Sequence, residues 1–301
     1  MASLRWAAGT LAVLLVPMGA PAQELEPGAY WPIARGINII TAVDSFNWGD
    51  IAFEPSVPID EASARINTTV VAFTRAFNLA GRSANAGLSL PIVGGRLEGI
   101  YLGAPAEARR FGLGDPRLRL AMNLYGAPTM TPAAFASYVQ KTIVGVSVTV
   151  APPLGEYDSA KVINLGTHRW SIKPEVGLSQ TIGRWVVEMM AGVWVFTDNT
   201  EFRETHTRTQ ARIIATQAHL TYKFNRTTWL AGDANFYTGG RTAIDGELNL
   251  DLQRNSRVGA TFSTAIARGQ AIRMSVSRGA YTTIGADFNS VAVSYSYAWV
   301  R

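Results

Sequence analysis

The chain has 301 residues, of which 48% are hydrophobic and 16% charged, with no cysteine and a formal net charge of +5. The charged fraction is below the roughly 25% of a typical soluble domain, which argues against a disordered, nucleic-acid-coating or coiled-coil protein. The lack of cysteine excludes disulfide scaffolds, thiolate zinc sites and cysteine nucleophiles. The positive charge is spread along the whole chain, so it does not mark a nucleic-acid groove.

The first 22 residues have the features of a secretory signal peptide. Arg5 supplies the positive start, residues 6–16 form a short apolar stretch, and Ala20-Pro21-Ala22 is an A-x-A cleavage signal. This apolar stretch is too short for a transmembrane helix, which needs about 20 residues. We therefore expect a signal peptide over residues 1–22 and a periplasmic segment over residues 23–34. An uncleaved N-terminal anchor is the alternative.

Within residues 35–301, which we expect to form the barrel, several segments alternate between apolar and polar positions. Val144, Val146, Val148 and Val150, for example, alternate with Gly145, Ser147 and Thr149. A period of two residues indicates strands with one apolar and one polar face. These segments are longer than the 5–6 residues usual in globular proteins and match the roughly 9–11 residues of a tilted membrane-crossing strand. Length therefore favours a membrane barrel over a soluble sandwich.

Short and long connections alternate between these segments, as in outer-membrane barrels with tight periplasmic turns and longer external loops. The exception is 126–137, which we interpret as a periplasmic insertion. We predict an all-β, transmembrane, antiparallel up-and-down β-barrel of about 12 strands with both termini in the periplasm. The predicted strands are 35–48, 64–79, 83–94, 113–125, 138–152, 168–181, 185–197, 211–224, 228–239, 248–266, 271–279 and 288–300.

Aromatic residues gather near the predicted strand ends. Amphipathic rings prefer the membrane interface, so this distribution favours two lipid-facing girdles. The preference of aromatic residues for sheets is the alternative explanation. The residues concerned are Trp48, Tyr125, Tyr138, Trp170, Trp185, Trp194, Phe196, Tyr222, Phe224, Trp229, Tyr237 and Trp299.

If the apolar face meets lipid, the polar face lines the lumen. We take Arg117, Arg119, Lys173, Glu175 and Asp233 as candidates for contact with a passing solute, because lumen charge tunes selectivity. The alternative is that these charges pair with one another and only hold the barrel together. A 12-strand barrel is also narrower than a porin. Interior side chains or residues 23–34 could largely fill it.

The sequence offers little for an enzyme. It contains no G-x-S-x-G, H-E-x-x-H or P-loop motif, and His219 is the only histidine within a well-patterned strand. We therefore expect no catalytic residue, no cofactor and no metal centre. The acidic residues of the first long loop could bind divalent cations that bridge to lipopolysaccharide, or could simply be solvated. They are Asp44, Asp50, Glu54, Asp60 and Glu61.

Several segments resemble the bacterial family of phenol-degradation meta-pathway transporters. They include Leu25–Tyr30, Gly112–Pro116, Pro152–Asp158, Asn164–Gly177 and Ile182–Asn199. The resemblance implies an outer-membrane barrel that passes aromatic or other hydrophobic compounds. One departure is the C-terminus, which ends in Trp299-Val300-Arg301 rather than on an aromatic residue.

We therefore expect a passive channel in the bacterial outer membrane for a small hydrophobic or aromatic solute. Its expected partners are outer-membrane lipids, lipopolysaccharide and the barrel assembly machinery, with no nucleic acid. A closed structural or adhesive barrel without a pore is the second hypothesis. A soluble periplasmic β-protein is the third.

Overall fold

The computed structural model describes residues 25–52, 59–101, 103–161 and 163–300. The signal peptide predicted for residues 1–22 lies outside the described residues. Within the described part of the chain no helix has the length and apolar character to cross a membrane.

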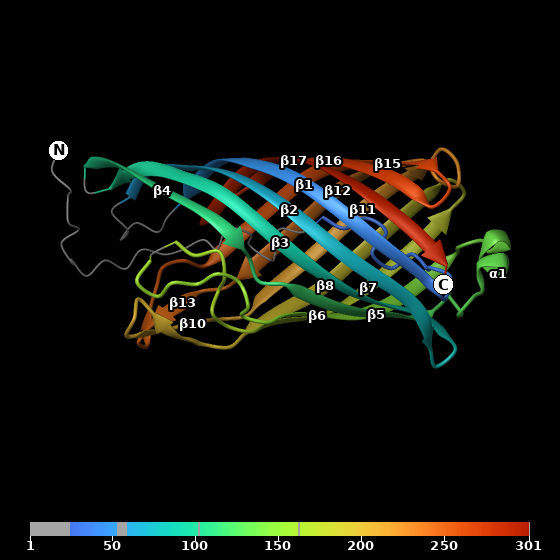
Figure 1. Cartoon of the computed structure of the whole chain (residues 1–301), viewed down its shortest axis with the longest axis horizontal. Helices are drawn as coiled ribbons and strands as arrows, with labels where there is room; N and C mark the ends of the chain where they lie inside the picture. The colour runs from blue at the N-terminus through green and yellow to red at the C-terminus, as the bar shows by residue number, and fades with distance from the viewer. Residues whose placement is uncertain (1–24, 53–58, 102, 162, 301) are drawn as a thin grey trace.

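Twelve antiparallel strand positions close into a barrel (Figure 1). β4 and β5 are two halves of one position, interrupted at residues 114–116, and both pair with β3. β1 pairs with β17, and β2 with β3, which closes the wall. The wall strands are β1 (Ile37–Ala52), β2 (Ile59–Leu79), β3 (Arg82–Tyr101), β4 (Ala104–Leu113), β5 (Arg117–Tyr125), β6 (Thr142–Ala151), β7 (Ser171–Ile182), β8 (Trp185–Phe196), β11 (Ile213–Lys223), β12 (Trp229–Gly239), β15 (Gln253–Ala267), β16 (Gln270–Tyr281) and β17 (Gly285–Val300).

The predicted fold and strand number are confirmed, and the differences lie at the strand ends. The long loop expected over residues 95–112 is mostly hairpin, because β3 and β4 stay in register from Ile92–Leu113 out to Tyr101–Ala104. Two other segments expected as loops contribute a small second sheet. This sheet contains β9 (Asn199–Phe202), β10 (His206–Gln210), β13 (Thr242–Ile244) and β14 (Glu247–Leu248).

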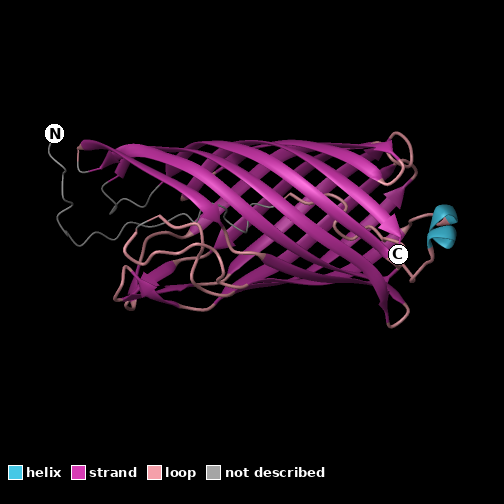
Figure 2. Cartoon of the chain, viewed as in Figure 1, coloured by secondary structure: helices cyan, strands magenta, loops and turns pink. Residues whose placement is uncertain are grey.

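The two ends of the barrel differ in the length of their connections (Figure 2). Helix α1 (Pro132–Ser137) lies near the C-terminus, at the end that carries the tight turns. It occupies the insertion expected at residues 126–137, and Thr131 caps it by accepting from the Ala134 N–H at 3.3 Å. The long loops and the second sheet lie at the opposite end. Because outer-membrane barrels keep short turns in the periplasm, we assign the end with α1 to the periplasm.

The wall is apolar outside and polar inside. In β7, Lys173 and Glu175 are buried, whereas Ile172, Val176 and Leu178 are exposed. The same alternation recurs in β8, β11 and β12. The apolar outer face suits contact with lipid. The closed wall also leaves no unpaired strand edge within the bilayer.

The expected aromatic girdles are only partly correct. Trp48, Tyr125, Trp170, Trp185 and Phe224 lie exposed on the outer surface. Trp194, Trp229 and Tyr237, by contrast, are buried inside the barrel. These three occupy inward positions of the alternating pattern, which nearness to a strand end alone does not reveal.

Candidate functional site

The N-terminal segment lies in the lumen. The Glu26 N–H donates to Gln217 Oε1 and the Gly28 N–H to Glu188 Oε2, both at 3.0 Å. A turn that needs a positive φ at Gly28 (+82°) aims the following residues at the wall. Residues 23–34 were expected as a periplasmic segment that could also fill the lumen; the described part of that segment enters the barrel. Its backbone donors find acceptors on inward-facing side chains of β8 and β11.

Tyr30 anchors this segment against β6 and β7. Its hydroxyl lies 2.9 Å from Ser147 Oγ and donates to Glu175 Oε1 at 3.0 Å. Gly145 and Gly177 pair directly across the two strands and leave room for the ring. A β-carbon at either glycine would stand 2.2 Å from a ring atom of Tyr30. These two glycines therefore form a slot for the tyrosine.

Three of the five predicted site residues lie around this anchor, and a fourth lies further along β5. Lys173 and Glu175 form an ion pair of 3.1 Å with both side chains almost fully buried. Arg119 lies over the Tyr30 ring, with Cζ 5.3 Å from its centroid. Arg117 shares the inward face of β5 with Arg119 and is half-buried. The structure thus groups residues from β5 and β7 that are more than fifty positions apart in sequence.

The fifth predicted residue, Asp233, belongs to a separate buried cluster. Its carboxylate lies 2.7 Å from His219 Nδ1 and accepts from Thr261 Oγ1 at 2.6 Å. These bonds tie β11, β12 and β15 together inside the lumen. Glu188 faces His219 across the β8–β11 pair. Asp233 is therefore held by hydrogen bonds to two neighbouring strands. Contact with a solute stays a prediction for all five residues.

A second group of contacts holds the segment at the periplasmic end. Trp31 and Trp229 meet edge to face at 5.5 Å between ring centroids. Lys223 Nζ lies 4.1 Å from the centre of the Trp31 ring, and Arg273 Cζ lies 5.2 Å from that of Trp229. Cations over indole rings are favourable contacts, so these residues narrow the lumen and stabilise the segment together.

Toward the external end the inner surface carries two apolar clusters, set among buried polar residues such as Asn255 and Arg257. One cluster combines Trp194, Ile213, Ala215 and Tyr237, with Phe196 beside it. A second cluster contains Ala64, Ile66, Val93, Leu165, Ala286 and Phe288. Neither cluster was predicted as part of the lumen. In β2 both alternate sets mix apolar and polar residues, so the sequence does not show which face of this strand turns inward.

The external loops pack over this apolar region. Asp115 accepts from the Gly155 N–H at 2.9 Å and from the Thr167 N–H at 2.8 Å. Arg169 lies over the Phe196 ring, with Cζ 4.4 Å from its centroid. In the second sheet, hydrogen bonds from His206 and the Thr207 N–H hold the pKa of the Asp245 carboxyl below its usual range. These contacts fix the loops at the mouth of the barrel.

The acidic residues of the first hairpin do not converge on one point. Asp44 faces outward and accepts from Asn67 Nδ2 at 3.0 Å and Thr69 Oγ1 at 2.8 Å. Asp60 and Glu61 are exposed, and Glu54 lies outside the described residues. Among the residues that the structure describes, no group of three or more histidines and carboxylates is arranged to hold a metal ion.

A family model described as "Putative MetA-pathway of phenol degradation" matches residues 36–295. The chain belongs to this family. The match covers nearly the whole barrel, which confirms the resemblance seen in the sequence. No match was found among curated proteins.

Solved structures with the same architecture include the COG4313 outer membrane channel from Pseudomonas putida F1. It is 20% identical, with a TM-score of 0.78 over 92% of this chain and 100% of that one. The β domain of the Bordetella autotransporter BrkA is 11% identical, with a TM-score of 0.48 over 88% and 100%. The CymD monoaromatic hydrocarbon channel is 11% identical, with a TM-score of 0.44 over 89% of each chain. At 20% identity, the similarity to the COG4313 channel shows the fold alone.

Proposed function

We propose that this protein is a passive outer-membrane channel for small hydrophobic or aromatic compounds. The observation that carries the proposal is the division of the lumen. Two clusters of apolar and aromatic side chains lie in its external half, and the N-terminal segment narrows the half nearer the periplasm. A nonpolar ring would gain favourable burial in the first region. The polar, ion-paired narrow region would slow the passage of ions.

We infer that Trp194 contacts such a solute when the side chains around it move aside, because its ring is enclosed in the structure. Its side chain is fully buried, and Lys173 Nζ lies 5.3 Å from the centre of its ring. Its indole Nε1–H has no hydrogen-bond partner among the described residues. A buried donor without a partner is costly, so an oxygen on the solute would be a favourable acceptor. A phenolic compound supplies both the flat ring and that oxygen, which agrees with the family description.

The second hypothesis, a closed structural barrel, is favoured by the segment that occupies the lumen and by the buried pairs around it. Two measurements on the refolded mature chain separate the hypotheses. Single-channel currents in a planar bilayer report a continuous aqueous path. Uptake of labelled phenol into liposomes, measured above the uptake by protein-free liposomes and compared with a charged aromatic of similar size, reports solute passage. We expect small discrete currents and preferential phenol uptake. Absence of both from a folded barrel would contradict the channel.

A further inference from the structure

Outside the lumen, the wall formed by β1 to β4 carries an ordered set of charged and aromatic rows. Arg65 on β2, Arg96 on β3 and Arg109 on β4 pair directly across neighbouring strands. Trp48 continues the row on β1. All three arginines face outward, because the residues that flank Arg65 in sequence, Ala64 and Ile66, are buried on the inner face. We call Arg65, Arg96 and Arg109 the arginine row.

The rows below the arginine row place it at the level of lipid headgroups. One step of two residues along each strand toward the membrane lie Phe46 and Phe111, whose side chains are 45% and 78% exposed. One step further lie Ile92 and Leu113, which are also exposed, in a row that continues on β2 and β1 with Thr69 and its hydrogen-bond partner Asp44. A strand rises about 3.3 Å per residue and tilts by about 35–45°, so each two-residue step is roughly 5 Å along the membrane normal. Aromatic rings mark the interface, and the arginines therefore lie just beyond it.

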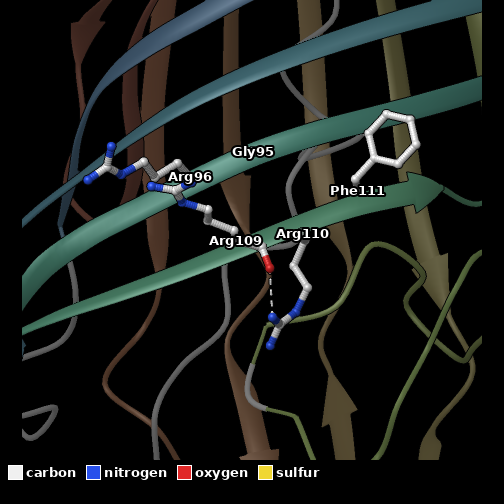
Figure 3. Close-up of a pocket in the computed structure, with 5 residues that line it drawn as sticks. All are labelled: Gly95, Arg96, Arg109, Arg110 and Phe111. Atoms are coloured by element: carbon white, nitrogen blue, oxygen red, sulfur yellow. Dashed lines mark hydrogen bonds between the residues drawn. The ribbon is translucent and has the colours of Figure 1, made fainter. Parts of the chain in front are cut away.

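The arginine row is open to ligands (Figure 3). Arg96 and Arg109 extend side by side from β3 and β4, whereas Arg110 turns toward the loop that follows β6, where it donates to the Ile163 carbonyl. A shallow hollow of about 510 Å³ lies beside them, lined by Gly95, Arg96, Arg109, Arg110 and Phe111. The arginine side chains remain 46% and 70% exposed.

Carboxylates form the next row outward. Glu98 and Glu107 pair across β3 and β4, and they contact Arg96; Glu107 also contacts Arg109. Exposed ion pairs of this kind contribute little to stability, so they do not hold the guanidinium groups against a stronger ligand. A phosphate is such a ligand, because the planar guanidinium fork bonds two of its oxygens at once.

From this geometry we propose that the arginine row binds the phosphorylated headgroup of lipopolysaccharide in the outer leaflet. The guanidinium groups contact the phosphates, while Phe111 and the stacked pair Phe46 and Trp48 contact the adjoining apolar part of the lipid. Charge complementarity and depth both favour this occupant: the arginines meet anionic groups at the height where the apolar wall ends. The site is independent of the lumen, so it stands whether or not the channel conducts.

The test measures lipid retention by the purified mature chain in detergent, using native mass spectrometry with bisphosphorylated lipid A. The test variant is R65Q/R96Q/R109Q, and the matched control is R212Q/R254Q/R268Q, which removes three exposed arginines that lie outside this row. We expect the test variant to lose roughly tenfold or more in affinity, because it lacks the charge-assisted bonds to phosphate, and the control to bind as the unmodified protein does. The unmodified protein should also prefer bisphosphorylated to monophosphorylated lipid A.

Three results would overturn the proposal. The first is equal retention by the test and control variants. The second is equal binding of the two forms of lipid A. The third is displacement of the lipid by inorganic phosphate at the same concentration, which would reveal a free-phosphate site. Heat-dependent gel mobility verifies folding. If the triple variant does not fold, R109Q alone serves, because its 70% exposed side chain is not part of any core.

Discussion

The ring of Tyr30 lies so close to Gly177 that a β-carbon at Gly177 would stand 2.2 Å from Tyr30 Cε2. This contact joins the N-terminal segment to the barrel wall at a point where only glycine fits. It also makes the position of the segment testable by a single substitution in the wall.

Gly177→Val should push Tyr30 out of its slot and loosen the segment in the lumen. We expect single-channel conductance of the mature chain to rise by roughly twofold or more, because the width and lining of the narrow region limit the flow of ions. Gly232→Val is the matched control: Gly232 lies on the outer face of β12 with no atom within 4 Å of its would-be β-carbon. Equal conductance of both variants would show that the segment does not restrict the lumen.

Glu175→Gln should destabilise the barrel more than the double replacement Lys173→Ala with Glu175→Ala. The single change removes the carboxylate charge that lies 3.1 Å from the buried Lys173 ammonium. Breaking a buried pair on one side typically costs about 3–5 kcal/mol, whereas removing both partners costs less. Urea unfolding, followed by gel mobility without boiling, measures the difference. The double variant also tests the predicted site: unchanged ion selectivity and unchanged solute flux would remove these two residues from it.

Asp233→Asn should weaken the connection of β11, β12 and β15. The change removes the charge that His219 and Thr261 both contact, and a weakened buried hydrogen bond of this kind costs about 1–3 kcal/mol. The urea midpoint should fall accordingly. Asp158→Asn, in an exposed loop, is the control and should leave the midpoint in place. If both variants unfold alike, the cluster does not stabilise the lumen.

Trp194→Ala should slow the uptake of phenol while leaving ionic conductance equal to or above that of the unmodified protein. The substitution removes the buried ring and the indole donor proposed to contact the solute. Trp185→Ala, on the lipid-facing side of the same strand, controls for general loss of aromatic area. A parallel fall in phenol uptake for both variants would argue against a specific contact at Trp194.

The second sheet should lose protection in acid. Because its folded-state pKa is lowered, the Asp245 carboxylate stabilises the contact between β10 and β13 above the ordinary pKa of 3.8, and this contribution disappears as pH falls through the lowered value. Hydrogen exchange of residues 206–210 and 242–248, corrected for the intrinsic effect of pH, should therefore accelerate below about pH 4. Asp245→Asn should show fast exchange at both neutral and acidic pH. Protection that is the same at pH 7 and pH 3 would contradict the assignment.

The sequence by itself determined the class of fold. Alternation in β6, β7, β11 and β12 shows which residues face inward, because a strand turns every second side chain to the same side. Lys173, Glu175 and Asp233 were therefore identifiable as inward-facing candidates before their partners were known. The length of the strands and the alternation of short and long connections further indicated a membrane barrel.

Tertiary structure decided what occupies the lumen and what the inward residues contact. The pairing of Gly145 with Gly177, and the fit of Tyr30 between them, depend on register and on the path of a segment that has no periodic pattern. The packing of Trp194 against Ile213 and Tyr237 likewise depends on which residues of distant strands lie opposite one another, as does the cross-strand alignment of Arg65, Arg96 and Arg109. Alternation fixes only the face of each residue, and a shift of register preserving that face would change every one of these neighbours.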